Sequence, residues 1–192
     1  YRAVTLYCLR QGWFEGDTLR EEALRAVIDD LEITFHFNPS TGRADTYLNG
    51  EDVEQEIRTM AVAEKVSLVA ALGFVRKALV AKQQAMGKEK GVVMDGRDIG
   101  TVVFPDAELK LFVTASQEVR ARRRMEELRA KGTPVSFEEV LENVRKRDYL
   151  DSTRTEGPLR QADDALVLDN SDMTLAEQKA WVLEQYHRVV DV

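Results

Sequence analysis

The stretch that decides the fold is Gly91-Val92-Val93-Met94-Asp95-Gly96-Arg97-Asp98. Its apolar run, residues 92–94, is typical of a strand that is buried on both faces of a parallel sheet. The polar residues that follow would lie at the carboxyl end of that strand, where open α/β sheets bind their ligands. A guanidinium between two carboxylates at such an edge suits a planar anion such as phosphate. A plain βα turn, in which the carboxylates only cap nearby N–H groups, is the alternative.

The composition is that of a globular protein with one main domain. The chain has 192 residues, of which 44% are hydrophobic and 32% charged, and its net charge is −7. This negative charge argues against broad attraction to nucleic acid or anionic membranes, so any bound anion must be held by local arginines. The single cysteine, Cys8, excludes an internal disulfide framework, and no apolar run is long enough to span a bilayer. We therefore expect a cytoplasmic monomer without nucleic-acid or membrane partners.

The hydrophobic pattern predicts helices that alternate with strands. Helices are expected over residues 1–9, from a cap at Asp17 or Thr18 to about 31, and over 59–86 with an interruption at Gly73. Further helices are expected after the caps at 116, 136 and 174. Strands are expected over 109–114 and 165–168, and a hairpin over 33–48. This alternation indicates a parallel sheet, beside which residues of about 30–90 form a small α/β insertion.

Arginines are concentrated after the central stretch. One predicted helix carries Arg120 and Arg122–Arg124. The next predicted helix ends with Arg147, Asp151 and Arg154, which recur at helical spacing. The last three residues can share one helical face and could bind one ligand. A solvated face in the first helix and a surface ladder of ion pairs in the second explain the same patterns equally well.

Three motifs together resemble bacterial cytidylate kinases. They are DGRDIGTVVFPD at 95–106, RRM at 123–125, and R-D-x-x-D-x-x-R at 147–154. The resemblance implies an α/β three-layer P-loop kinase fold with a parallel sheet flanked by helices and a small inserted subdomain containing the antiparallel hairpin. It implies one nucleoside monophosphate kinase domain over residues 1–192, with the CMP-binding insertion at about 30–90 and a lid at about 120–135. The implied reaction, part of pyrimidine nucleotide metabolism, is transfer of the γ-phosphoryl group of ATP to CMP or dCMP, with Mg²⁺ as cofactor.

The resemblance also implies residue roles, which physical chemistry supports because phosphoryl transfer depends on positioning and charge neutralisation. We expect no metal ligand set from the protein itself. His36 lies in a strand pattern and His187 in the terminal helix pattern, so both are expected to be structural residues. The cytosine edge would be bound by Ser67, Arg76 and Asp98. The CMP phosphate would be held by Arg2, Arg97 and Arg154, and the ribose hydroxyls by Arg147 and Asp151. The lid over ATP would carry Arg123 and Arg124, and the residues closest to the transfer would be Arg97, Arg124, Arg154 and Asp95, the last ordering the magnesium and phosphate region.

One family motif has no match in the sequence. The phosphate-binding loop Gly-x-x-x-x-Gly-Lys-Ser/Thr does not occur. Since a strand–loop–helix unit of that kind needs roughly 30 residues, we expect about that many before Tyr1, so that the domain is N-terminally incomplete. Two alternatives follow: a catalytically inactive nucleotide-binding or scaffolding domain, and a related kinase with another monophosphate acceptor.

Overall fold

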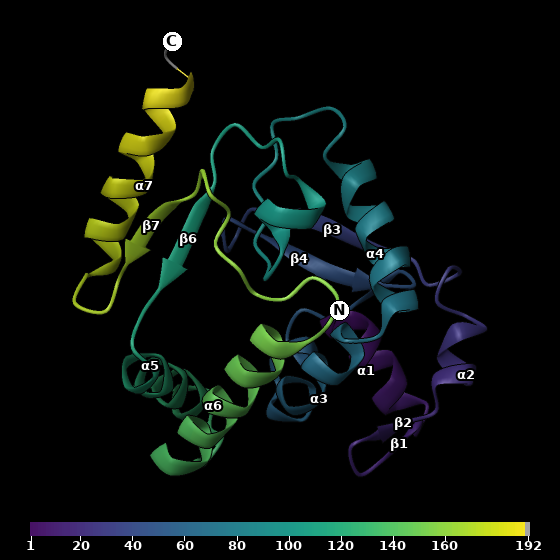
Figure 1. Ribbon diagram of the computed structural model, residues 1–192. Coiled ribbons are helices and arrows are strands. Elements are labelled where there is room, and N and C mark those ends of the chain that lie inside the picture. Colours follow the sequence, from purple (N-terminus) through teal and green to yellow (C-terminus); the bar gives the residue numbers. More distant parts are fainter. Residues whose placement is uncertain (191–192) are drawn as a thin grey trace. The chain divides into compact units, whose positions relative to one another are not determined.

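The structure is a computed structural model that describes residues 1–190, and it divides into two compact units (Figure 1). Unit 1 contains Tyr1–Lys90 together with the short segment Arg154–Glu156. Unit 2 contains Gly91–Thr153 and the chain from Gly157 onward. The predicted α/β class is confirmed, and within the described part of the chain no helix is both long enough and apolar enough to cross a membrane.

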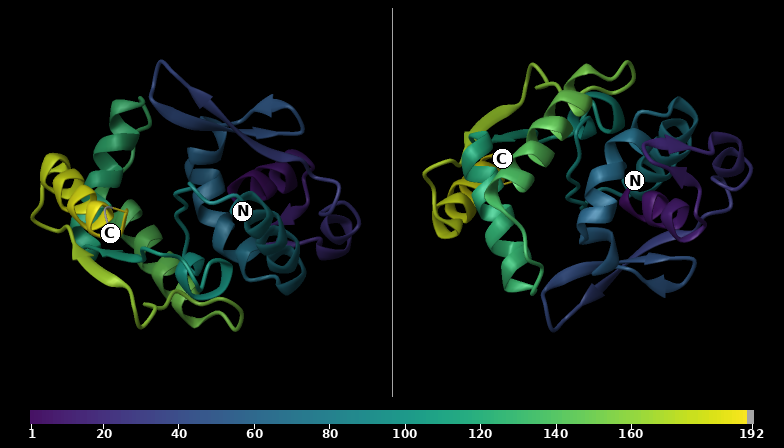
Figure 2. Two further views of the ribbon diagram at one scale, coloured as in Figure 1. Left: turned by 90° about the horizontal axis from the view of Figure 1, so that it is seen from above. Right: turned by 90° about the horizontal axis from the view of Figure 1, so that it is seen from below.

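Unit 1 combines helices with a three-stranded antiparallel sheet of order β3-β4-β5. The predicted hairpin is confirmed, with Ile33 opposite Leu48 and Asn38 opposite Arg43, and Figure 2 shows it as a twisted ribbon at one end of the unit. A second, very short hairpin joins β1 to β2. The elements in order are α1 (Arg2–Arg10), β1 (Phe14–Glu15), β2 (Thr18–Leu19), α2 (Glu21–Arg25), β3 (Ile33–Asn38), β4 (Arg43–Leu48), β5 (Glu51–Asp52), a 3₁₀ turn (Glu56–Arg58), α3 (Met60–Ala70) and α4 (Gly73–Met86).

Helix α1 lies between two apolar clusters because it is apolar on two faces. Val4 and Cys8, four residues apart, are fully buried in one cluster with Leu24. Ala3 and Leu6, three residues apart, are buried in the other. Side chains at these spacings share a helix face. Burial of each large aliphatic side chain contributes roughly 1.5–3 kcal/mol, so these clusters are the main source of stability in unit 1.

Unit 2 contains one parallel strand pair and three long helices. Strand β6 (Leu111–Thr114) pairs with β7 (Leu166–Asp169) in parallel, as predicted. The helices are α5 (Gln117–Ala130), α6 (Phe137–Thr153) and α7 (Leu175–Val190), and a π-helix spans Ile99–Val103.

The caps predicted for these helices are confirmed. The hydroxyl of Ser116 accepts a hydrogen bond from the N–H of Val119 at 3.2 Å at the start of α5. The pair Ser136 and Glu139 forms the reciprocal capping box of α6, with bonds of 2.7 and 3.1 Å. Thr174 and Glu177 form the same box at α7. Each box satisfies N–H groups that have no partner inside the helix.

Two local predictions are wrong. Residues 92–94 form no strand: Val93 is 99% exposed, and none of the described strands pairs with this segment. An apolar run becomes a buried strand only where neighbouring strands accept its hydrogen bonds, and here none does. Asp17 and Thr18 cap no helix, because α2 begins only at Glu21. Gly16 has a left-handed backbone conformation, and Asp17 and Thr18 lie in the β1–β2 hairpin that follows from this turn.

Candidate active site

Arginines of unit 2 gather around the middle of α6. Asp151 of this helix is only 4% exposed and accepts a 2.9 Å hydrogen bond from Nε of Arg97. Arg147 lies one turn earlier on the same helix, and its Nε is buried with no hydrogen-bond partner among the described residues. An unpaired buried donor costs about 1–3 kcal/mol, so this group favours an acceptor brought by a ligand.

The charges around Arg147 are not balanced. Burial lowers the pKa of Arg147, and the guanidinium of Arg97 lowers it further, with a smaller effect from Arg124. The carboxylates of Asp151 and Asp148 oppose these effects without overcoming them. The folded protein therefore disfavours the charged form of Arg147, and a bound anion would relieve that cost. A planar, multiply charged group such as phosphate fits guanidinium geometry best.

The loop that precedes the π-helix fixes the neighbours of Arg97. The carbonyl of Asp98 accepts a 2.9 Å hydrogen bond from the N–H of Val102, and 3.3 Å bonds from Thr101 and Val103. The side chain of Asp98 is buried, whereas Asp95 is exposed. π-Helical turns are rare and often occur at functional sites. The turn gives Asp98 a rigid backbone next to Arg97.

The arginines of α5 are held in three different ways. Arg120 forms a bidentate ion pair with Asp148 of α6, at 2.8 and 2.7 Å. Arg123 donates to the side chain and carbonyl of Asn170, at 2.9 and 2.6 Å, and to the carbonyl of Ser171. Arg124 pairs with Glu127 at 2.9 Å. Of these three, Arg124 alone acts electrostatically on Arg147, so it belongs to the same cluster.

The carboxylate of Asp148 was not singled out by sequence reasoning. Burial raises the pKa of Asp148, but hydrogen bonds from Arg120 and Gln117 outweigh it and hold this pKa below its ordinary value. Arg120 lies 28 residues away in sequence, so no local spacing could indicate the pair. An aspartate next to Arg147 was the only available signal.

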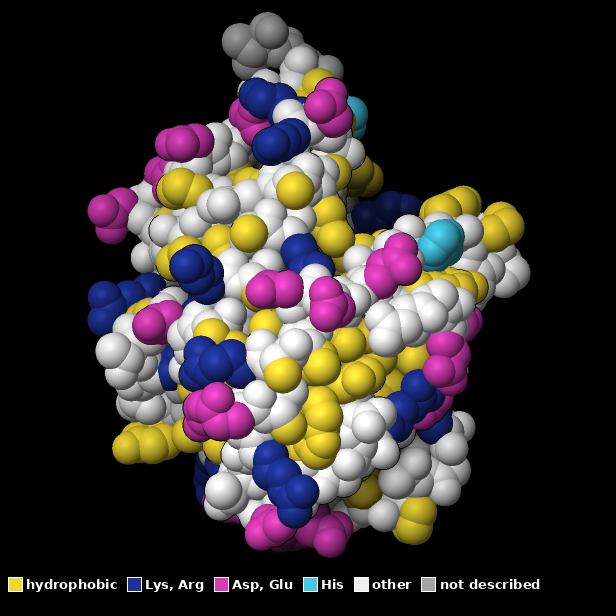
Figure 3. Space-filling view, turned by 90° about the vertical axis from the view of Figure 1, so that its right-hand side faces the viewer, with side chains coloured by type: hydrophobic (Ala, Val, Ile, Leu, Met, Phe, Trp, Pro, Cys, Tyr) yellow, Lys and Arg dark blue, Asp and Glu magenta, His cyan; other side chains and the backbone are white. Residues whose placement is uncertain are grey.

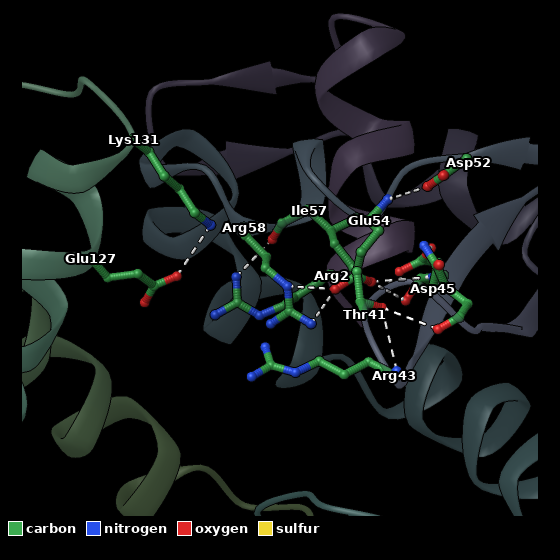
Figure 4. A network of polar contacts seen from close by, with 12 residues as sticks. Arg2, Thr41, Arg43, Asp45, Asp52, Glu54, Ile57, Arg58, Glu127 and Lys131 are labelled. Atoms are coloured by element: carbon green, nitrogen blue, oxygen red, sulfur yellow. Dashed lines mark hydrogen bonds and ion pairs between the residues drawn. The ribbon is translucent and has the colours of Figure 1, made fainter. Parts of the chain in front are cut away.

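Unit 1 contains Arg2, Ser67 and Arg76. Nη1 of Arg2 donates to the carbonyl of Ile57 at 2.7 Å, as Figure 4 shows. Ser67 and Arg76 are each 4% exposed and lie on α3 and α4, on either side of the Leu72–Gly73 junction. The Arg76 guanidinium lies 5.7 Å from the centre of the Tyr1 ring. A buried arginine and a buried hydroxyl beside one helix junction can together provide hydrogen bonds to a polar, planar group.

The sequence predicted that Arg154 can share a helical face with Arg147 and Asp151. This prediction is wrong, because α6 ends at Thr153. The hydroxyls of Ser152 and Thr153 bond to backbone carbonyls of the last turn. The carbonyl of Asp151 accepts the N–H of Leu159 at 2.7 Å instead of continuing the helix. Side-chain hydroxyls that occupy carbonyls in this way compete with helix continuation.

The segment Arg154–Glu156 belongs to unit 1 and lies against the start of α4. A Cβ atom added at Gly73 would lie 2.8 Å from Oε1 and 3.0 Å from Oε2 of Glu156. Glycine is therefore what lets the carboxylate approach the first residue of α4.

One face of the molecule carries charged side chains of both signs. Figure 3 shows one face on which lysine and arginine side chains lie interspersed with aspartate and glutamate side chains. Among residues 1–190, no group of three His, Cys, Asp or Glu side chains is arranged to hold a metal ion. Anion binding therefore depends on the local arginine cluster, in agreement with the net charge of −7.

Comparison with known proteins gives one consistent result. The family model described as cytidylate kinase matches residues 1–188. A protein of Parabacteroides distasonis named cytidylate kinase is 74% identical over 190 residues, which cover 99% of this chain and 83% of that protein. Proteins of the same name from Bacteroides thetaiotaomicron and Flavobacterium johnsoniae are 63% and 50% identical, over 99% and 100% of this chain and 83% and 84% of those proteins.

Proposed function

The chain belongs to the cytidylate kinase family and is a phosphotransferase, and from that premise we propose that it phosphorylates CMP and dCMP with ATP as donor. The observation that carries this proposal for the substrate site is the buried, unpaired Nε of Arg147 within an excess of positive charge. A nucleoside monophosphate supplies both a dianion and hydroxyl groups that accept hydrogen bonds. The alternative of an inactive binding domain gains no support from the named relatives.

In this proposal the monophosphate binds at the cluster around α6. Arg97 holds the phosphate, while Arg147 and Asp151 contact the ribose hydroxyls. Arg97 holds the carboxylate of Asp151 in place through a 2.9 Å hydrogen bond, and a carboxylate is an acceptor for hydroxyl groups. The family resemblance assigns Arg2 and Arg154, which belong to unit 1, to the CMP phosphate as well. Several guanidiniums meet the main demand of phosphoryl transfer, which is to neutralise charge on the transferred group.

Recognition of cytosine is assigned to three buried side chains. The guanidinium of Arg76 and the hydroxyl of Ser67 can donate to the ring acceptors of the base, and the carboxylate of Asp98 can accept from its exocyclic amine. Their burial supports this role. A base that lacks the matching hydrogen-bonding groups would leave buried polar side chains unpaired, so such a site discriminates strongly between bases.

Arg123 and Arg124 are assigned to the ATP side, with Arg124 nearer the transferred phosphoryl group because it acts on Arg147. Arg123 would have to exchange its bonds to Asn170 and Ser171 for a phosphate. Magnesium usually binds through ATP phosphates and only one or two carboxylates, so the lone exposed carboxylate of Asp95 fits a role in holding its water shell. The ion would neutralise charge on the ATP phosphates.

The proposal also includes a monomeric, cytoplasmic enzyme. Both proposed substrates are metabolites of the cell interior, which supports the localisation. Sedimentation equilibrium of the intact protein checks the first point, and a mass of twice the chain would contradict it.

The test is steady-state turnover of the intact protein with ATP and each of CMP, dCMP and UMP. We expect CMP and dCMP to be phosphorylated. Arg97→Ala should lower kcat/KM for CMP by about 100-fold, because it removes a charged contact to the CMP phosphate, which accepts the phosphoryl group. Arg188→Ala, which removes an exposed ion pair with Glu184 on α7, is the control with unchanged rates. CMP binding without any ATP-dependent turnover would support the inactive domain instead, and a preference for UMP would support the other acceptor.

A further inference from the structure

A polar clasp joins α5 to α6 in unit 2. We use this name for Gln117, Arg120 and Asp148. Both outer nitrogens of the Arg120 guanidinium bond to the two carboxylate oxygens of Asp148, at 2.8 and 2.7 Å. Its Nε donates to the carbonyl of Ala115 at 3.0 Å, and Gln117 donates to Asp148 at 3.1 Å. All three guanidinium nitrogens are thus engaged, so Arg120 is fixed in place and is not poised to bind a nucleotide.

The clasp acts on the half of α6 in which no apolar side chain is fully buried. The buried residues of this helix are Val140, near its start, and Asp151. Tyr149, next to Asp148, is 68% exposed, and Leu150 is half-buried. Polar contacts therefore contribute much of what holds the C-terminal half of α6 in place. Ala115 directly follows β6, so the clasp connects α6 to the carboxyl end of a strand.

We propose that Gln117, Arg120 and Asp148 are positioning residues, which hold α6 at the rotation that presents Arg147 and Asp151 to the substrate monophosphate. This inference rests on the proposed function. Asp148 immediately follows Arg147 and precedes Asp151 by less than one helical turn, so any rotation of Asp148 carries both site residues with it. The clasp itself touches neither substrate.

A purely stabilising ion pair would behave differently. The side chains of Arg120 and Asp148 are 37% and 33% exposed, and pairs of this kind contribute about 1 kcal/mol or less to stability. Loss of such a pair would lower the melting temperature slightly and leave KM values unchanged in the folded protein. A positioning pair changes the KM of one substrate selectively. That difference is measurable.

The experiment compares Arg120→Ala, Asp148→Ala and the double variant in the intact protein, well below their melting temperatures. We expect KM for CMP to rise about tenfold in each, since small misplacements of binding groups have large effects on rate and binding. The double variant should match the single ones, because each residue acts through the other. KM for ATP should not change, since Ala121 and Leu128 anchor α5 in the interior. Arg188→Ala is the control. Arg120→Lys should restore KM for CMP only in part, because an ammonium group cannot form the bidentate pair that the guanidinium forms with Asp148.

If an alanine variant does not fold, Asp148→Asn tests the same point, because it keeps an acceptor for Arg120 and should raise KM for CMP by about twofold to threefold. An unchanged KM for CMP in folded Arg120→Ala would overturn the inference. Multiplicative effects of the two substitutions on KM for CMP in the double variant would overturn it as well.

If the unsubstituted protein neither binds nor phosphorylates CMP, the proposed function is itself wrong and the inference is wrong with it. Normal turnover in the unsubstituted protein with unchanged variants refutes the clasp alone.

Discussion

Unit 1 and unit 2 are built with different chemistry. Both clusters of buried apolar residues lie wholly in unit 1, around α1 and α3. In unit 2, charged side chains link α6 to α5 and to the loop at Arg97, through the pairs Arg120–Asp148 and Arg97–Asp151. Unit 1 also has ion pairs, such as Arg10–Glu51, but these add to its apolar packing. Unit 1 is therefore held mainly by packing, whereas unit 2 contains an excess of positive charge around Arg147.

The largest expected effect is on packing in unit 1. Leu24→Ala removes a fully buried side chain from the cluster with Val4 and Cys8, and should lower the free energy of unfolding of unit 1 by about 2–5 kcal/mol. Trp13 packs against this cluster, so its fluorescence in a Trp181→Phe background reports unit 1 during denaturation.

Leu175→Ala is the matched control for Leu24→Ala, because the same atoms are removed from a side chain that is 84% exposed. It should change the free energy of unfolding of unit 2 by less than about 0.5 kcal/mol. Equal losses in the two variants would mean that burial does not distinguish these sites.

The next effect separates stability from activity in unit 2. Arg147→Leu removes a guanidinium whose lowered pKa shows that the fold disfavours its charge, so we expect unit 2 to gain roughly 1 kcal/mol in free energy of unfolding. The same variant should lose about 100-fold in turnover of CMP, because an apolar side chain cannot bind the substrate. Trp181 fluorescence in a Trp13→Phe background measures the first quantity. A less stable and fully active variant would contradict both expectations.

A third effect concerns the thiol in the core of unit 1. Burial raises the pKa of Cys8 from 9.0 to about 11. Between pH 9 and pH 11 the unfolded chain therefore loses a proton that the folded chain retains, so stability should fall as the pH rises through this window. The loss should be on the order of 2–3 kcal/mol, since the pKa shift is about two units and each unit corresponds to about 1.4 kcal/mol. Denaturation curves of Cys8→Ala, which has no thiol, should lack this component of the decline.

The smallest effect is that of salt. Raising the ionic strength from about 0.01 M to about 1 M shortens the screening length from about 30 Å to about 3 Å. We expect the free energy of unfolding of unit 2 to fall by a few tenths of a kcal/mol, and the Arg120→Ala variant to respond less. Unit 1 has exposed ion pairs of its own, such as Arg10–Glu51, so its free energy of unfolding, monitored through Trp13, should fall by a similar few tenths of a kcal/mol. A free energy of unfolding that salt leaves unchanged in both units would mean that these pairs contribute nothing to stability.

Sequence reasoning succeeded where the determining residues are neighbours. The capping boxes at Ser136 and Thr174 are confirmed because each is complete within four residues, and the hairpin at 33–48 is confirmed because its turn residues separate two β-rich runs. The P-loop kinase fold and the phosphotransferase activity that the resemblance implied are confirmed by the family match. The domain boundaries and the roles of the individual site residues remain predictions.

The failures have physical causes that no local pattern contains. Whether residues 92–94 become a strand depends on which other strands are available to pair with them, and whether a helix passes Thr153 depends on competing hydroxyls. The partner of Arg120 lies on another helix. A single sequence gives no measure of such distant pairing, so the motif at 147–154 contains Asp148 without showing that it pairs with Arg120.

The two strand pairings also differ in how far apart their partners lie along the chain. Partners in β3 and β4 are joined by a short turn, and a hairpin of this kind closes in about 1–10 μs. Partners in β6 and β7 are 55 residues apart in the sequence, with α5 and α6 between them, so their pairing must wait for slow loop closure. During synthesis the hairpin and the helices up to α4 are complete before β7 has been made. The packed unit can therefore form on the ribosome while the charged unit is still an open chain.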